Sequence, residues 1–144
     1  MSGLVNHVGL AVSDLDRSRR FYEEVLGFTF KNEISVPDGA TTRMFALEGP
    51  LALRAAYLEH NGWVLELLCF EAAGVAEPRE RVINEAGLTH ISICVEDVDA
   101  TEASALAHGG EVLAERSFKG MVSLIRDPDG QLIELLPMSY RDTL

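Results

Sequence analysis

Two histidines and two glutamates occupy matching places in two parts of the chain. His7 lies in the stretch VNHVGLAVSDLD, and His90 lies in LTHISICVEDVD, 83 residues later (90 − 7). Glu66 is the central residue of VLELL, and Glu134 is the central residue of LIELL, 68 residues later (134 − 66). Imidazoles and carboxylates are common ligands of divalent transition metals, so these four side chains could hold a metal ion that acts as a Lewis acid.

Both glutamates lie in apolar runs that are typical of strands, and this setting asks for a partner. An ionised carboxylate in apolar surroundings costs several kcal/mol unless it is paired or bound to a metal. No lysine or arginine recurs beside both glutamates. A lone histidine in a strand is more often a core residue with hydrogen-bond partners. Four potential ligands at repeated positions instead favour one divalent cation, which would balance two carboxylates and two neutral imidazoles.

These positions recur because the chain is internally duplicated. Residues 5–16 align without gaps on residues 88–99, and EHNGWVLELL aligns on DPDGQLIELL nearer the end of each copy. The drop in offset from 83 to 68 gives the first copy 15 more residues (83 − 68). The extra length is predicted to lie around VPDGATTRMF. A fixed internal offset of this kind indicates repeated supersecondary units.

Each copy is predicted to form a strand, a helix and then further strands. In the first copy the strand covers residues 5–12 and the helix covers about 14–26, with Gly27 at its C-terminal end. In the second copy the strand covers about residues 89–95 and the helix about 98–108. Asn61-Gly62 and the run Asp127-Pro128-Asp129-Gly130 are turn signals between strand-like runs. We therefore predict two βαβββ modules, over about residues 4–70 and 87–138, with a linker over about 71–86, together one domain of residues 1–144.

The stretches HVGLAVSDLDRSRRFYEEVLGF, THISICVEDVDA and RDPDGQLIELL resemble the module signatures of the vicinal oxygen chelate superfamily. That superfamily includes glyoxalase I, methylmalonyl-CoA epimerase, extradiol dioxygenases, and fosfomycin and bleomycin resistance proteins. The resemblance implies an α+β fold in which two tandem βαβββ modules form an open, U-shaped mixed sheet around a metal cleft. The metal ligand positions of the superfamily fall on His7, Glu66, His90 and Glu134. The resemblance also implies one divalent ion, which could be Zn, Ni, Co, Mn or Fe. It further implies a homodimer, in which the ligands of one metal come from one chain or from two.

The resemblance implies chelation of a small substrate through two neighbouring oxygens. In the isomerase members a metal-bound glutamate removes a proton next to a carbonyl, giving a metal-stabilised enediolate. That glutamate corresponds to Glu134, with Glu66 as its counterpart, so the chain is expected to be an isomerase, epimerase or lyase. One alternative is an Fe(II) extradiol-type dioxygenase, which uses two histidines and one carboxylate. Another is a bleomycin-resistance-like binding protein without catalysis, although that alternative predicts missing ligands.

The resemblance also bears on the substrate. Bacterial glyoxalase I usually has an arginine four residues after the first ligand and an asparagine four residues after the second, and both hold glutathione. Those positions are Ala11 and Phe70, so a glutathione adduct is disfavoured and a small carbonyl acid or thioester is expected. Lys119 occupies a loop where relatives often hold an anionic substrate. The aromatic residues expected to line the site are Phe45, Phe70 and Phe118.

Composition narrows the classes of partner. The chain has 144 residues, a hydrophobic share of 47%, a net charge of −11 and a pI near 4.7. Such a surface repels phosphate backbones, so the expected partner is a small molecule rather than a nucleic acid. No apolar stretch is long enough to span a membrane, and the N-terminus lacks a basic signal-peptide start. The two cysteines, Cys69 and Cys94, are expected to be thiols in a cytoplasmic protein.

Overall fold

A computed structural model describes residues 3–76 and 82–143 of the chain. The chain divides into two compact units. Unit one takes in the residues up to Arg19 and then Gly27–Ala76, and unit two takes in Arg20–Leu26 and the chain after Ala76. Of the predicted linker over about residues 71–86, residues 77–81 lie outside the described part. The predicted extent of the domain and of its modules stays a prediction.

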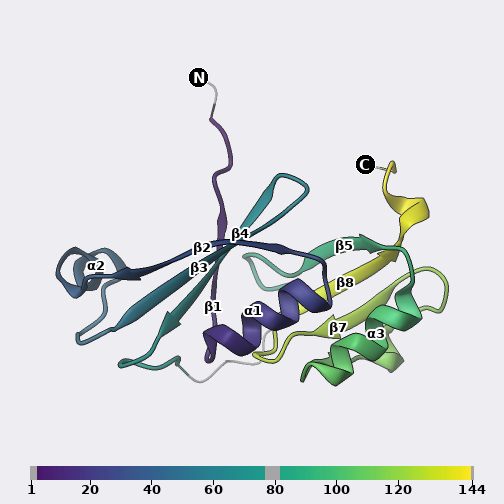
Figure 1. The fold of residues 1–144 in the computed structure, drawn as a ribbon. Coiled ribbons are helices and arrows are strands. Elements are labelled where there is room, and N and C mark those ends of the chain that lie inside the picture. Colours follow the sequence, from purple (N-terminus) through teal and green to yellow (C-terminus); the bar gives the residue numbers. More distant parts are fainter. Residues whose placement is uncertain (1–2, 77–81, 144) are drawn as a thin grey trace. The chain divides into compact units, whose positions relative to one another are not determined.

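Unit one contains a four-stranded mixed sheet in the order β1-β4-β3-β2 (Figure 1). Strand β4 pairs in parallel with β1 and antiparallel with β3, and β3 pairs antiparallel with β2. The elements are β1 (Val8–Ala11), α1 (Leu15–Glu24), β2 (Thr29–Val36), α2 (Asp38–Phe45), β3 (Leu53–His60) and β4 (Trp63–Phe70). Helix α1 begins where predicted, because the Asp14 carboxylate accepts a hydrogen bond of 2.9 Å from the backbone N–H of Arg17.

Alternation along β3 and β4 gives the sheet of unit one two different faces. Leu65, Leu67 and Cys69 on β4 are buried, whereas Glu66 and Leu68 between them are only partly covered. Neighbouring residues of a strand point to opposite faces, so the buried set forms the core side of the sheet. Packing of the apolar side chains on this side removes apolar surface from water, and this burial stabilises the unit. The polar side chain of β4, that of Glu66, lies on the opposite side of the sheet.

A tight turn sets the register of β3 against β4. Asn61 and Gly62 both have positive φ, of 52° and 83°. This conformation is the one that a two-residue type I′ hairpin requires, and asparagine and glycine adopt it most readily. The turn pairs His60 with Trp63, and the same register brings Tyr57 opposite Glu66.

Unit two repeats the sheet with the order β5-β8-β7-β6. Strand β8 pairs in parallel with β5 and antiparallel with β7, as β4 does with β1 and β3. The Asp97 carboxylate caps α3 by accepting a hydrogen bond of 2.9 Å from the N–H of Ala100. The elements are β5 (Ile91–Val95), α3 (Val98–Ala107), β6 (Glu111–Val112), η1 (Ala114–Arg116), β7 (Ser123–Arg126), β8 (Leu132–Pro137) and η2 (Met138–Tyr140).

The predicted α+β fold of two βαβββ modules is confirmed, because each unit has a mixed sheet in the same strand order. Part of the extra length of the first copy lies in α2, between β2 and β3, and β2 with 8 residues is also longer than β6 with 2. Strands β1 and β5 are shorter than predicted, and each begins one residue after its histidine, His7 or His90. The U-shaped arrangement around a cleft concerns both units together and stays a prediction.

The second half of α1 packs within unit two. Phe21 and Tyr22 are fully buried. The Tyr22 hydroxyl donates a hydrogen bond of 3.0 Å to the Asp127 carboxylate in the turn between β7 and β8. A Cβ added at Gly110 would lie 2.8 Å from the Phe21 ring. Glycine at that position therefore allows the close approach of Phe21 to the segment that follows α3.

Two further sequence expectations concern thiols and membranes. Cys69 and Cys94 are free thiols, as predicted, and Cys69 is buried. Among the described residues, no helix combines the length and the apolar character needed to cross a lipid bilayer.

Candidate functional site

In unit one, His7 lies just before β1 and points at Glu66 on β4, the strand that pairs in parallel with β1. The His7 Nε2 atom lies 3.1 Å from Glu66 Oε2. The other carboxylate oxygen, Oε1, accepts a hydrogen bond from the Tyr57 hydroxyl on β3. The Tyr57 ring meets the His7 ring edge to face, with centroids 5.8 Å apart. Both oxygens of Glu66 are therefore engaged by side chains from the two strands that flank β4.

Unit two presents the same pair of residue types. His90 Nε2 lies 3.7 Å from Glu134 Oε2. The same oxygen accepts a hydrogen bond of 2.6 Å from the Ser92 hydroxyl on β5. Of the four predicted metal ligands, the structure thus brings together one histidine and one glutamate within each unit.

Each histidine is oriented through its other ring nitrogen. His7 Nδ1 lies 2.7 Å from Asn6 Oδ1, and His90 Nδ1 lies 2.8 Å from Thr89 Oγ1. Asn6 and Thr89 are equivalent positions in the repeat, at the same offset of 83 (89 − 6). An oxygen that holds Nδ1–H leaves the lone pair of a neutral imidazole on Nε2, and metal-binding histidines usually have such a partner. The Nε2 atom of each histidine is the one that faces a glutamate.

These pairs fit a divalent metal ion. Two ligand atoms that each lie about 2.1 Å from one ion are about 3.0–3.4 Å apart at octahedral to tetrahedral angles. The separation in unit one, 3.1 Å, lies within this range, and that in unit two, 3.7 Å, is slightly longer. Among the described residues no three side chains of histidine, cysteine, aspartate or glutamate gather into one group, so each unit offers two ligands.

The two glutamates are less buried than their apolar neighbours in the sequence indicate. The Glu66 side chain is 13% exposed and the Glu134 side chain 28% exposed. They lie on the partly covered side of their sheets, because each alternates with buried leucine or isoleucine residues along its strand. The expectation that both are buried is therefore corrected to half-buried. Each carboxylate is satisfied by a histidine and a hydroxyl as well as being open to solvent.

Tyr57 and Ser92 are contributors that the sequence analysis did not identify. The hydrogen bond to Glu66 and, to a smaller extent, burial raise the pKa of Tyr57 to about 12. The Tyr57 hydroxyl is therefore a proton donor at neutral pH. A signal for Tyr57 was present in the sequence. A two-residue turn at Asn61-Gly62 pairs residues that are symmetric about it, and this symmetry places residue 57 opposite residue 66.

The aromatic residues expected at the site divide between the two units. In unit one, Phe45 at the end of α2 meets Phe70 at the end of β4 edge to face, with centroids 5.9 Å apart. Phe70 and Ala11 share the sheet face of Glu66, because Phe70 lies four residues along β4 and Ala11 pairs with Leu68. The two positions that the resemblance assigns to glutathione binding are thus both apolar and on the face of the ligand pair.

In unit two, Phe118 and Lys119 are exposed in the turn before β7. Phe118 forms an isolated bridge with Val122, which closes this turn. Within the described part of the chain, Lys119 makes no hydrogen bond or ion pair with His90 or Glu134, and its role in substrate binding stays a prediction.

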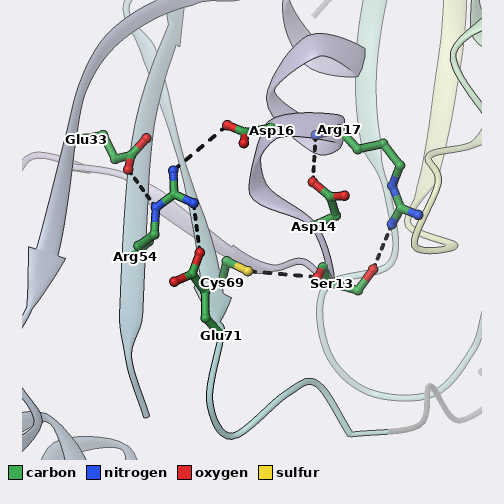
Figure 2. A network of polar contacts seen from close by, with 8 residues as sticks. All are labelled: Ser13, Asp14, Asp16, Arg17, Glu33, Arg54, Cys69 and Glu71. Atoms are coloured by element: carbon green, nitrogen blue, oxygen red, sulfur yellow. Dashed lines mark hydrogen bonds and ion pairs between the residues drawn. The ribbon is translucent and has the colours of Figure 1, made fainter.

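A separate charged cluster surrounds Arg54 on β3 (Figure 2). Its guanidinium donates hydrogen bonds of 2.8 Å to Glu33 and 2.8 Å to Glu71, and lies 3.9 Å from Asp16. The hydrogen bonds to Glu33 and then Glu71 raise the pKa of Arg54 further above its ordinary value. Arg54 pairs with Cys69, which is three residues from Glu66, so it projects from the opposite face of the sheet. This cluster ties β2, β3, α1 and the end of β4 together, and it is not part of the ligand site.

Comparisons with known proteins agree with the two-module fold. The family model described as Glyoxalase/Bleomycin resistance protein/Dioxygenase superfamily matches residues 4–135. A protein of Vibrio cholerae named probable lactoylglutathione lyase is 34% identical over 134 residues, covering 90% of this chain and 87% of that protein. A probable chloroplastic lactoylglutathione lyase of Arabidopsis thaliana is 33% identical over 134 residues. The alignment covers 90% of this chain but only 34% of the length of that protein.

A solved structure of a glyoxalase family protein from Bacillus cereus superposes with a TM-score of 0.77 at 24% identity, covering 92% of each chain. At that identity the likeness concerns the fold. The match of the family model over residues 4–135, together with the relative from Vibrio cholerae, concerns the sequence as well. The chain therefore belongs to the glyoxalase/bleomycin resistance protein/dioxygenase superfamily.

Proposed function

We propose that this chain is a cytoplasmic, divalent-metal-dependent isomerase or lyase that chelates a small oxygenated substrate. The observation that supports this function best is the repeated pair: each unit directs a histidine Nε2 at a glutamate oxygen, with an oxygen partner on the histidine Nδ1. Relatives named lactoylglutathione lyase support enzymatic activity of this class.

One metal ion would be held by His7, Glu66, His90 and Glu134, with both pairs from one chain or one pair from each of two chains. Protein sites for such ions use imidazole and carboxylate ligands, and four ligands of this set carry two negative charges to balance the ion. The bound ion supplies Lewis-acid polarisation of two neighbouring substrate oxygens. The metal could be Zn, Ni, Co, Mn or Fe.

The chain's own residues would then move the proton. Glu134 removes a proton from the carbon next to the polarised carbonyl and returns it to a neighbouring position. Its exposure of 28% leaves room for a substrate carbon to approach the carboxylate. Glu66 is the equivalent residue in the first copy and belongs to the other ligand pair. Its negative charge would stay in place at that pair.

For the substrate we propose a small carbonyl acid or thioester. The relatives are named for lactoylglutathione, but Ala11 and Phe70 stand where the resemblance places residues that hold glutathione. Apolar side chains form no hydrogen bonds with a charged peptide, so a glutathione adduct is disfavoured. Lys119 would bind the anionic group of the substrate, and Phe45, Phe70 and Phe118 would contact its apolar part.

The first experiment is the metal content of protein purified without added metal or an affinity tag. We expect about one equivalent of a divalent metal per site, and loss of most of it in Glu66→Gln and in Glu134→Gln, because an amide oxygen is a much weaker ligand than a carboxylate. Glu48→Gln, which alters an exposed carboxylate in the connection between α2 and β3, is the matched control and should retain the metal.

The same preparations decide between the candidate reactions. Exchange of solvent deuterium into small hydroxy-ketones and thioesters, with no turnover of glutathione plus methylglyoxal, would support the proposal. Efficient formation of lactoylglutathione would overturn the proposed substrate class and leave the metal site intact. Bound iron with oxygen uptake on catechols would indicate the dioxygenase alternative. Protein that binds no metal, and gains no thermal stability when metals are added, would refute the catalytic proposal in favour of a ligand-binding protein.

A further inference from the structure

The two glutamates of the repeat are held in different ways. In unit one, each oxygen of Glu66 has its own partner: Oε2 faces His7 Nε2 at 3.1 Å, and Oε1 accepts the Tyr57 hydroxyl. In unit two, both partners of Glu134 lie near the same oxygen, Oε2: the Ser92 hydroxyl at 2.6 Å and His90 Nε2 at 3.7 Å. Among the described residues, the other oxygen of Glu134 makes no hydrogen bond or ion pair. Glu66 is thus restrained at both ends of its carboxylate, and Glu134 at one.

The difference follows from the register of the sheets. The residue opposite Glu66 on the antiparallel neighbour is Tyr57, and the residue opposite Glu134 on the equivalent strand is Leu124. On the parallel neighbouring strand, the residue with a hydroxyl is found in unit two and not in unit one. Gly9 lies beside Glu66, and Ser92 lies beside Glu134. Each copy therefore carries one hydroxyl donor, on opposite sides of its glutamate.

Tyr57 is well placed to act through Glu66. Its side chain is half-buried, and its ring rests edge-on against His7, the other ligand of the pair. A tyrosine ring has few rotatable bonds, so a packed ring holds its hydroxyl at a defined position. The hydroxyl reaches Oε1, the oxygen that does not face His7 Nε2. It leaves Oε2 as the oxygen available beside that imidazole nitrogen.

We propose that Tyr57 is a positioning residue that fixes Glu66 as a metal ligand through Oε2, an arrangement for which the second copy has no equivalent. This inference rests on the proposed metal-dependent function. Hydrogen-bond partners of ligating carboxylates hold the ligand in its binding geometry, and removal of such a partner typically lowers metal affinity by about 10–100-fold. Glu134, which lacks the second restraint, keeps an oxygen able to change partners during the reaction.

The test is Tyr57→Phe, which removes the hydroxyl and keeps the ring against His7. With Co²⁺ as the probe and a chromophoric chelator as competitor, we expect the metal affinity of the variant to fall by about tenfold or more. The thermal midpoint of the metal-free protein should change little, because the ring packing is retained. Tyr140→Phe, which makes the same change in η2, is the matched control and should bind Co²⁺ like the unaltered chain.

Gly9→Ser in the Tyr57→Phe background tests whether the hydroxyl must reach Oε1 of Glu66. It places a serine at the position that Ser92 holds in the second copy, where that hydroxyl donates to Glu134. A Cβ at Gly9 would lie 3.4 Å from Leu68 and 3.5 Å from Glu66 Oε2, both ordinary contacts. The new hydroxyl would therefore lie near Oε2 and leave Oε1 without a donor, so we expect the metal affinity to stay low.

The outcomes separate this inference from the proposed function. If the unaltered chain binds Co²⁺ and Tyr57→Phe binds it equally well, the positioning role is overturned and the metal site stands. A loss of affinity that Gly9→Ser fully corrects, or that comes with a lower thermal midpoint of the metal-free protein, also overturns it. If the unaltered chain binds no Co²⁺, the proposed function itself fails.

Discussion

At the scale of single residues, Asp127 is the most deeply buried carboxylate of the described chain. Burial raises its pKa, and the backbone N–H of Gln131, the Tyr22 hydroxyl and the N–H of Asp129 oppose the rise. Burial and the neighbouring Asp127 raise the pKa of Tyr22 well above its ordinary value, so Tyr22 stays a donor. The hydrogen bond between them joins α1 to the β7–β8 turn within unit two.

Tyr22→Phe should destabilise the protein by about 1–3 kcal/mol at pH 7, because a buried carboxylate loses a donor. An aspartate whose native pKa lies above its unfolded value binds more protons in the native state between the two pKa values. Stability therefore falls as the pH rises through that window. Loss of the Tyr22 donor raises the native pKa of Asp127 further, so the penalty should shrink at about pH 3.5, where the carboxyl is protonated in both states.

Urea unfolding of Tyr22→Phe and of the unaltered chain at both pH values measures this difference. Asp127→Asn is the control, since the amide keeps an acceptor for the N–H groups of Asp129 and Gln131 but carries no charge. It should flatten the pH dependence between those values. An equal penalty for Tyr22→Phe at pH 7 and at about pH 3.5 would contradict the assignment.

At the scale of elements, the connection from α3 to β6 depends on the absence of a side chain at Gly110. A Cβ there would lie 2.7 Å from the Arg126 carbonyl oxygen and 3.0 Å from that of Ala105, as well as 2.8 Å from the Phe21 ring. Backbone atoms cannot move away as a flexible side chain can. The close approach of Phe21 to the α3–β6 connection is thus compatible only with glycine at position 110.

Gly110→Ala should lower the free energy of unfolding by about 2–3 kcal/mol, because the added methyl group forces backbone shifts at the α3–β6 connection. Gly39→Ala is the matched substitution. Gly39 lies in α2 with no atom within 4 Å of an added Cβ, so alanine there should be neutral or stabilise by up to about 1 kcal/mol. Chemical denaturation of both variants checks the pair, and similar effects at the two sites would refute the steric explanation.

The elements also show how far the sequence patterns reach. The helices α1 and α3 begin close to the predicted residues, and an aspartate caps each of them, because capping is a local interaction between residues three apart. The turn residues predicted both hairpins for the same reason. Strand ends were less well predicted: β6 has only two residues, and β1 and β5 begin after their histidines. Strand length depends on pairing with distant segments, which local patterns do not specify.

At the scale of the whole molecule, exposed apolar side chains precede each histidine. Leu4 is 99% exposed, Val5 83% and Leu88 75%. Val5 and Leu88 are equivalent positions of the repeat, two residues before His7 and His90. Large apolar side chains at repeated, solvent-exposed positions are typical of surfaces that another chain covers. Together with the resemblance, this supports the proposal that a second copy of the chain is the partner in a homodimer.

Sedimentation equilibrium should therefore give a mass of about twice the 15.8 kDa of one chain. Val5→Glu and Leu88→Glu should each weaken the dimer, because a carboxylate would be buried in the contact. Leu106→Glu, at an exposed apolar position of α3, serves as the control and should leave the mass unchanged. A mass of a single chain at all concentrations up to about 100 μM would contradict the proposal, since dimers with Kd values near 1 μM would be populated there.

The sequence by itself determined the duplication, the α+β fold and the residue types of the candidate ligands. It could do so because repeats, caps, tight turns and the alternation of apolar residues are written in short segments. The offsets matched His7 with His90 and Glu66 with Glu134, and only the structure showed that each histidine faces the glutamate of its own unit. Only the tertiary structure decided which hydroxyl holds each glutamate, and that Phe21 and Tyr22 pack within the second unit. Those contacts join residues far apart in the chain, and they depend on strand register and side-chain packing, which form only when the whole unit folds.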